Sequence, residues 1–364
     1  MVYIIKKYLS GWILKSSLSP SSKSYREKMS MTKGKRMKTN KFSIPVVLFT
    51  FKRVDTLERI FPVLKSANVT KLYIFSDGGR NEEEKALVNK TREQILKMID
   101  WDCEVIKEFA DNNQGVFNQI GMGAKKVFEK EEKAIFLEDD NLPEPTFFRY
   151  CEEMLNKYQD DERILWICGT NYESESSYLD TDYVFTKHLL PCGWASWSKK
   201  FNKYYLTSFS VLNDKGNRKK IKKAYESRWL YRQQIRSFRR EKYCEDHHRR
   251  FISWDFHMAL TIRLFGLYGI APKYNQIRNI GIDQLSTHGG TSKKKPNTAK
   301  FCEIPTHPLP DELKGPEEVS INKEFEKRFT KIVLVPLYIR LLFPFITFTK
   351  KILRMYPEKS FIKK

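Results

Sequence analysis

An apolar run that ends in three consecutive acids constrains the fold of this chain more than any other feature. Residues 133–137 lead directly into Glu138, Asp139 and Asp140. The run predicts a buried strand with the acids at its carboxyl end, where ligands of open α/β sheets bind. Adjacent carboxylates repel one another, and a hard divalent cation, Mn²⁺ or Mg²⁺, removes that repulsion. The stretch therefore predicts a metal–diphosphate site, with a solvated acidic loop as the alternative interpretation.

Segments with strand and helix character alternate on both sides of this run. The expected strands are 44–50, 71–76, 103–109, 133–137 and 164–168, and the expected helices include 57–67, 82–99, 116–130 and 146–158. This alternation predicts an α/β fold with a mixed, mostly parallel sheet flanked by helices. No GxGxxG sequence follows the first strand and the sequence contains no P-loop, so an NAD-type dinucleotide-binding domain is not expected.

The charge of the chain favours anionic partners. Its 66 Lys and Arg against 44 Asp and Glu give a formal net charge of +22, which suits phospholipid surfaces, nucleic acid or phosphorylated substrates. No RNP-type, helix-turn-helix or zinc signature appears, so nucleic acid is not expected as a partner. The six cysteines form no CxxC pair, which favours a reducing cytoplasm. The basic stretch 215–250 is expected to be helical, as a solvated face, a membrane-surface patch or an acceptor-phosphate site.

We expect three parts along the chain. Residues 1–42 form a basic, amphipathic tail that is expected to be disordered, and residues 43–300 form the catalytic domain. Residues 301–364 are expected to begin as a Lys-, Pro- and Glu-rich linker and to end in a basic, apolar segment. Two prolines and an arginine interrupt its apolar part, 332–348, which favours an in-plane anchor on an anionic membrane over a span. Packing against the catalytic domain is the alternative.

Three further stretches carry candidate site residues. Gly193 and Trp194 are candidates because glycine lets a substrate approach the backbone and tryptophan stacks on sugar rings, although the tryptophan also fits a core position. Ser253 is expected to cap an apolar helix, with Asp255 in its first turn. His288 follows in a loop and is a candidate metal or diphosphate ligand. The histidine pair His247-His248 is interpreted as structural.

The order of these pieces resembles the GT-A glycosyltransferases, in particular N-acetylglucosaminyltransferase I and related bacterial family 2-like enzymes. The resemblance covers roughly residues 43–290 and depends on five motifs: Phe51-Lys52-Arg53, Ser76-Asp77-Gly78, Glu138-Asp139-Asp140, Pro191 to Trp194, and Trp254-Asp255. It implies a GT-A nucleotide-diphospho-sugar transferase fold. The implied nucleotide-sugar-binding residues are Arg53, Asp77, Glu138, Asp139, Gly193 and Trp194. The implied metal ligands for Mn²⁺ or Mg²⁺ are Asp140 and His288, and the implied catalytic base is Asp255.

These features together predict a metal-dependent glycosyltransferase, of the hexosyl- or N-acetylhexosaminyltransferase class. We expect it to move sugar from a nucleotide-diphospho-sugar, a UDP-sugar, to a hydroxyl of a glycan or lipid-linked acceptor, with inversion. The expected setting is bacterial surface polysaccharide synthesis, peripheral on the cytoplasmic face of the plasma membrane.

Two alternatives stay open. A sugar-nucleotide pyrophosphorylase should carry a Gly-rich, basic loop after its first strand, where this chain has Thr-Phe-Lys-Arg-Val-Asp at 50–55. A degenerate, non-catalytic GT-A protein associated with the membrane is the other alternative.

Overall fold

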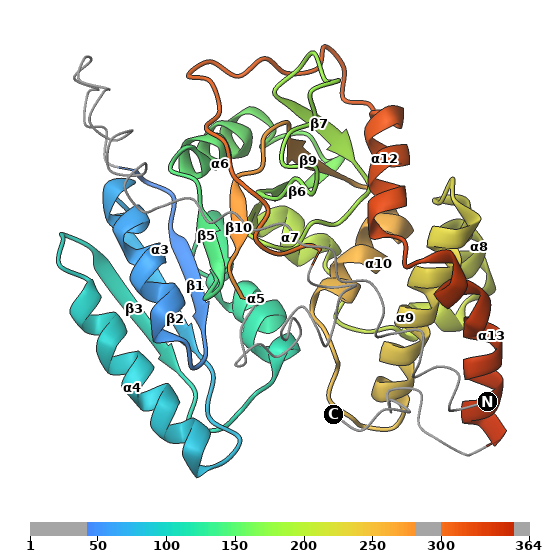
Figure 1. The fold of residues 1–364 in the computed structure, drawn as a ribbon, viewed down its shortest axis with the longest axis horizontal. Coiled ribbons are helices and arrows are strands. Elements are labelled where there is room, and N and C mark those ends of the chain that lie inside the picture. The colour runs from blue at the N-terminus through green and yellow to red at the C-terminus, as the bar shows by residue number, and fades with distance from the viewer. Residues whose placement is uncertain (1–41, 282–299, 353–364) are drawn as a thin grey trace, which may run out of the picture. The chain divides into compact units, whose positions relative to one another are not determined.

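A mixed β-sheet forms the centre of the protein (Figure 1). The computed structural model describes residues 42–281 and 300–352. Within these residues the central sheet has eight strands in the order β3-β2-β1-β4-β8-β6-β9-β7. Strands β7 and β8 run against the others. The expected α/β fold with a mixed, mostly parallel sheet is therefore confirmed.

The elements have the following bounds. The central strands are β1 (Val46–Thr50), β2 (Lys71–Ser76), β3 (Glu104–Phe109), β4 (Lys133–Glu138), β6 (Ile164–Cys168), β7 (Tyr183–Thr186), β8 (Trp194–Trp197) and β9 (Tyr268–Pro272), and β5 (Asn141–Pro143) pairs with β10 (Ile277–Asn279) in a separate ribbon. The helices are α3 (Val54–Ser66), α4 (Glu82–Met98), α5 (Gly123–Val127), α6 (Thr146–Lys157), α7 (Ser198–Tyr204), α8 (Lys215–Lys223), α9 (Arg228–Asp246), α10 (Asp255–Phe265), α12 (Lys323–Val333) and α13 (Leu337–Ile352), with a π-helix η1 (Phe117–Met122) and a 3₁₀-helix η2 (Ser210–Asn213).

Side chains alternate between two hydrophobic layers along the central strands. On β1, Val46 and Leu48 pack in the layer that contains α3 and α6. Val47 and Phe49 pack in the opposite layer, with α5, α7 and α10. A strand that is covered on both faces needs apolar residues at every position, which explains why this strand is a continuous apolar run.

The register of the parallel strands brings their carboxyl ends to one edge of the sheet. Thr50 of β1 pairs with Ser76 of β2, and Phe49 pairs with Glu138 of β4. The segments that leave these three strands therefore emerge side by side. This is the edge at which the sequence predicts the acids to lie.

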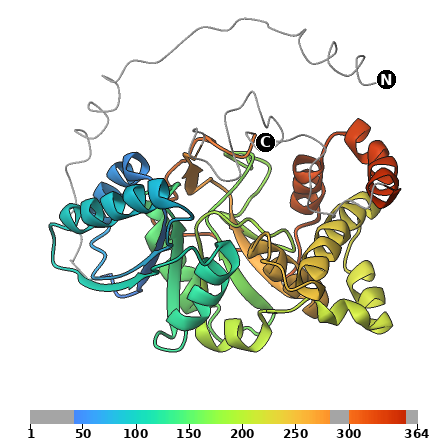
Figure 2. The ribbon, with the colours of Figure 1, turned by 90° about the horizontal axis from the view of Figure 1, so that it is seen from below.

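A helical layer formed by α8, α9 and α10 flanks this sheet (Figure 2). The stretch 215–250, expected as one helix, contains two. Asp214 accepts a hydrogen bond from the Asn217 N–H at 2.6 Å and caps α8, and Ser227 accepts one from the Leu230 N–H at 3.2 Å and caps α9. A second N-cap begins a new helix, so the chain turns between them.

Residues 304–334 pack on the domain, in contrast to the linker expected from position 301. The Arg149 guanidinium donates to the carbonyl oxygens of Pro310 and Asp311, at 2.6 and 2.8 Å. Helix α12 buries Phe325 and Phe329 completely. The extended segment is held here by its backbone carbonyls as well as by apolar side chains such as Leu309, and composition does not reveal the hydrogen bonds to these carbonyls. In the described part of the chain, no helix has the length and apolarity needed to cross a bilayer.

Candidate active site

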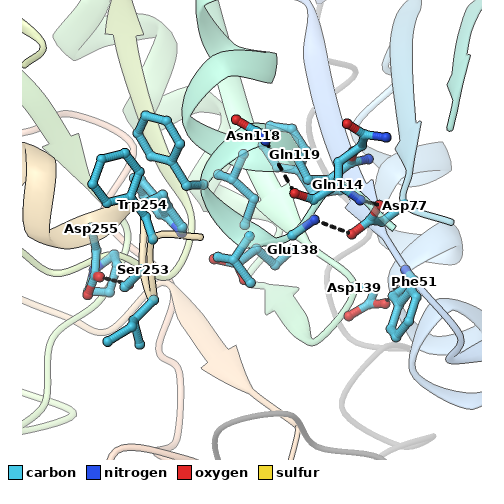
Figure 3. A pocket seen from close by; sticks show the side chains of 18 of the residues that line it. Phe51, Asp77, Gln114, Asn118, Gln119, Glu138, Asp139, Ser253, Trp254 and Asp255 are labelled. Atoms are coloured by element: carbon cyan, nitrogen blue, oxygen red, sulfur yellow. Dashed lines mark hydrogen bonds between the residues drawn. The ribbon is translucent and has the colours of Figure 1, made fainter. Parts of the chain in front are cut away.

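A cavity of about 1000 Å³ lies at the carboxyl edge of β1, β2 and β4. Its wall includes residues from the ends of these strands, from the π-helix η1 and from the segment 248–256. Figure 3 shows Asp255 and Ser253 on one side, Asp77 and Asp139 on the other, and Glu138 between them. All five motifs identified in the sequence thus contribute residues to one space.

The acids after β4 bind the segment after β1. The carboxylate of Asp139 accepts a hydrogen bond from the Phe51 backbone N–H at 2.8 Å. Asp140 Oδ2 lies 3.1 Å from Nη1 of Arg53, whose side chain is almost fully buried. The motifs Phe51-Lys52-Arg53 and Glu138-Asp139-Asp140 therefore form one unit, in which Asp139 and Asp140 each face a donor from the segment after β1.

Asp140 lies in a close-fitting cradle formed by β5 and β10. The Asn141 amide donates to Asp140 Oδ1 at 2.7 Å, and the Ile280 N–H donates to the Asp140 carbonyl at 2.8 Å. A Cβ at Gly281 would stand 2.3 Å from Asp140 Oδ2 and 2.8 Å from Arg53 Nη1. Only hydrogen fits at that position while the ion pair is in place.

Asp255 begins α10 and faces the same cavity. Ser253 was expected to cap this helix, but its hydroxyl donates to Asp255 Oδ1 instead. The charge of Asp255 also acts on Glu138: burial raises the pKa of Glu138 well above its ordinary value, and Asp140, Asp139 and Asp255 add to the rise. Arg53 opposes it. The carboxylate of Asp255 therefore shares one electrostatic environment with the acids at 138–140.

Asp77 lines the cavity, but its carboxylate holds a loop. Oδ1 accepts from the N–H groups of Gly78 and Gln114, at 2.8 and 2.7 Å. Oδ2 accepts from the Asn113 amide at 2.9 Å and from the Gly115 N–H at 3.1 Å. Four donors occupy the hydrogen-bonding capacity of a carboxylate. The geometry thus favours a loop-positioning role over the direct nucleotide contact expected from the sequence.

Gly193 and Trp194 are not among the described residues that line the cavity. Trp194 is buried in β8, with its ring stacked between Phe136 at 3.9 Å and Trp166 at 4.3 Å. It belongs to the core because β8 lies between two strands and is covered on both faces. Gly193 has a φ of 61° and its N–H donates to Asn141 Oδ1 at 2.8 Å. Because the Asn141 amide donates to Asp140, the hydrogen bond from Gly193 to Asn141 helps to position the Asp140 carboxylate.

Arg80 lines the cavity but was not identified from the sequence. Lys52 and Arg80 both bind the carboxylate of Glu84, at 2.8 and 2.7 Å. The hydrogen bond from Arg80 is the largest cause that lowers the pKa of Glu84 to about 2, and the contact with Lys52 adds to it. Both cations also lie over the ring of Phe51. The motif Phe51-Lys52-Arg53 identified the segment after β1 from the sequence. The contacts of Glu84 with Lys52 and Arg80 depend on the packing of α4 in the fold.

The segment 248–253 forms another part of the cavity wall, and its basic start belongs to the stretch 215–250 for which an acceptor-phosphate site was one of three interpretations. His248, expected to be structural, lines the cavity. Arg250 Nη1 donates to Asn113 at 3.0 Å, and the Ile252 N–H donates to the buried carboxylate of Glu241 at 2.8 Å. This segment therefore connects α9 to the loop held by Asp77.

The donor atoms at Asp140 fit a hard divalent cation. Each carboxylate oxygen of Asp140 has one partner, Arg53 or Asn141, and retains a second lone-pair site. Among residues 42–281 and 300–352, no group of three His, Cys, Asp or Glu side chains forms a ready metal site. Mg²⁺ commonly takes one or two carboxylates together with substrate phosphates, which suits this arrangement. His288 lies outside the described residues.

Comparisons with known proteins give distant likenesses. No protein-family model and no curated protein matches the chain. A UDP-glucose pyrophosphorylase complexed with UDP-glucose is 11% identical, over 65% of this chain and 93% of that one, with a TM-score of 0.33. The mannosyltransferase PcManGT from Pyrobaculum calidifontis, in complex with GDP-Man and Mn²⁺, is 9% identical over 66% and 75%, with a TM-score of 0.33. These values assign no activity to this chain.

Proposed function

We propose that this protein is a metal-dependent glycosyltransferase that uses a nucleotide-diphospho-sugar, with a UDP-sugar as the first candidate. One observation carries the proposal: Glu138, Asp139, Asp140 and Asp255 line a single cavity with Arg53. Glycosyl transfer needs stabilisation of the leaving diphosphate and a carboxylate that takes the proton of the acceptor hydroxyl. The cavity offers groups for both tasks.

The donor would lie between the ends of β1 and β4. Asp140, with His288 as a further candidate, would hold Mn²⁺ or Mg²⁺, which stabilises the negative charge that develops on the diphosphate. Arg53 would bind the diphosphate directly. Glu138 and Asp139 would contact the sugar or ribose, and the Phe51 ring offers a face on which a base can stack.

Asp255 would act as the catalytic base. Its carboxylate is oriented by the Ser253 hydroxyl and lies at the end of the cavity away from Asp77. One carboxylate that deprotonates an acceptor hydroxyl, which then displaces the diphosphate directly, gives inversion at the sugar carbon. General base catalysis of this kind contributes about 10²- to 10⁴-fold to the rate.

The acceptor would enter beside the segment 248–256. Arg240, Arg249 and Arg250 line this side of the cavity, and their charge suits an acceptor that carries phosphate. A glycan or lipid-linked glycan of bacterial surface polysaccharide, glycosylated at the cytoplasmic face of the plasma membrane, fits this requirement.

Calorimetry and product analysis on the full-length chain would test the proposal. A panel of sugar nucleotides would be titrated with Mn²⁺, with Mg²⁺ and with EDTA. We expect metal-dependent binding of one UDP-sugar, and release of nucleoside diphosphate when acceptor is added. Asp255→Asn should retain donor binding and lower kcat by about 10²-fold or more. An unchanged kcat would remove Asp255 from the base role.

The same assay separates the alternatives. A pyrophosphorylase would form pyrophosphate from a nucleoside triphosphate and a sugar 1-phosphate. A non-catalytic protein would bind donor without turnover, or would bind none.

A further inference from the structure

Helix α13 presents an apolar stripe to solvent. Six of its large apolar residues are between 50% and 70% exposed: Leu337, Tyr338, Leu341, Leu342, Phe345 and Ile352. At 100° per residue these positions fall within an arc of roughly 140° on one side of the helix. Elsewhere in the described chain, the exposed large apolar residues are Leu96, Met122 and Phe265, which are only 38% to 41% exposed and lie on three different elements. The stripe is therefore a continuous surface and not scattered exposure.

The opposite side of α13 is attached to α9, and Figures 1 and 2 both place the two helices side by side. Just before α13 begins, Gln233 of α9 donates to the carbonyl of Val333, the last residue of α12, at 2.9 Å and accepts from the Val335 N–H at 3.0 Å. The guanidinium of Arg236 lies 3.1 Å from the centre of the Phe343 ring. The stripe thus belongs to a helix held at a defined place on the protein.

Arginine side chains line the junction between α9 and α13. Arg232 and Arg340 lie over the ring of Trp229, at 5.4 and 5.0 Å from its centre, and Arg236 lies over Phe343. Within the described residues, the buried Nε of Arg340 has no hydrogen-bond partner. Guanidinium groups on aromatic rings beside an apolar surface are suited to phosphate groups at a water–hydrocarbon boundary.

Neighbouring helices add to the positive charge. Exposed cations on α8 and α9 are Lys215, Lys219, Lys220, Lys222, Lys223, Arg228, Arg232 and Arg239. Anionic lipid attracts such clusters, and an amphipathic helix with adjacent Lys and Arg lies in the plane of the headgroups. A second copy of this chain would bring the same cations to the interface, and with a net charge of +22 the two copies would repel one another.

We propose that α13, with the arginine-lined junction to α9, docks the protein on an anionic lipid bilayer. The apolar stripe enters the headgroup region, and Arg232, Arg236 and Arg340 bind lipid phosphates at its border. One helical turn beyond Arg236, Arg240 lines the candidate active site, so docking through α13 brings the acceptor side of the cavity close to the membrane.

Vesicle co-sedimentation of the full-length chain tests this surface. Vesicles of phosphatidylcholine alone would be compared with vesicles that also contain phosphatidylglycerol. We expect binding to the anionic vesicles that weakens as salt is added. The double variant Leu341→Glu, Phe345→Glu should bind about tenfold or more weakly, because charge replaces the apolar stripe. Leu96→Glu, which adds charge at an exposed leucine on α4, is the matched control and should bind as the parent does.

Arg232→Gln should lower the preference for anionic over neutral vesicles and keep the melting temperature, since its side chain is exposed. Equal binding by the parent and the stripe variant would overturn the proposal, as would the absence of binding by the parent. A parent dimer that the stripe variant converts to monomer, without vesicle binding, would identify a second copy as the occupant. None of these measurements needs a sugar nucleotide, so the result is independent of the proposed transfer reaction.

Discussion

The substitution Asp77→Asn separates two roles for the residue that follows β2. The four donors around its carboxylate are arranged as two pairs, one pair on each oxygen. An amide has one oxygen and one NH₂ group, so in either orientation two donors face another donor. Hydrogen bonds to a charged acceptor contribute about 1.5–3 kcal/mol each. Water reaches part of this loop, and we therefore expect a loss of about 3 kcal/mol in the free energy of unfolding.

Urea unfolding followed by circular dichroism would measure this loss. A change of about 3 kcal/mol is large against the 5–15 kcal/mol that is typical of whole proteins. Affinity for the sugar nucleotide should fall as well, because Gln114 and Gly115 line the cavity. Asp111→Asn is a matched control: it removes the same charge from the exposed start of the same loop and should change stability by less than about 0.5 kcal/mol.

The two roles give opposite results. If Asp77→Asn unfolds like the parent and yet loses affinity for the nucleotide, the carboxylate contacts the base directly and the loop is held by other groups. That outcome would refute the positioning role argued from the four contacts.

Three further predictions concern the site and its support. Asp140→Ala should abolish the metal-dependent part of donor binding, and calorimetry that gives equal affinities with Mn²⁺ and with EDTA would show that Asp140 binds no metal. Trp194→Ala should cost about 3–5 kcal/mol in urea unfolding, because its stacked ring is fully buried, and the protein that remains folded should bind donor normally. Burial raises the pKa of Glu241 to about 7 from its ordinary value of 4.5. Between these two pH values the folded protein binds more protons than the unfolded chain, so its stability falls as the pH rises from about 4.5 to about 7. Glu241→Gln should remove up to about 3 kcal/mol of this pH dependence, measured as urea stability in mildly acid and mildly alkaline buffers.

The edge of the sheet was predictable because its signals are local. A continuous apolar run is typical of a strand covered on both faces, and the polar residues that follow it must lie at the carboxyl edge. The alternation of strands and helices along 44–168 then determines that Arg53 and Asp140 lie at the same edge. The position of Asp255 followed from the start of an apolar helix and from the order of the motifs.

The features that were missed depend on contacts between distant segments. Nothing near Asp77 in the sequence indicates that residues 113–115 return to its carboxylate. Trp194 fitted either a binding stretch or a core position in the sequence, and the core position follows only from the insertion of β8 between β4 and β6. Residues 304–334 have the composition of a linker, and hydrogen bonds from Arg149 hold part of their backbone on the domain.

The ribbon of β5 and β10 has a consequence for the order of folding. Strands β1 to β4 are neighbours in sequence and can form early, whereas Arg53 meets the Gly281 carbonyl across 228 residues. Contacts of such long range carry the greatest loop-closure cost and form late. Ligand affinity should therefore appear only in the last step of refolding, after most of the secondary structure has formed. A nascent chain would therefore acquire its substrate site only when its C-terminal third has been synthesised.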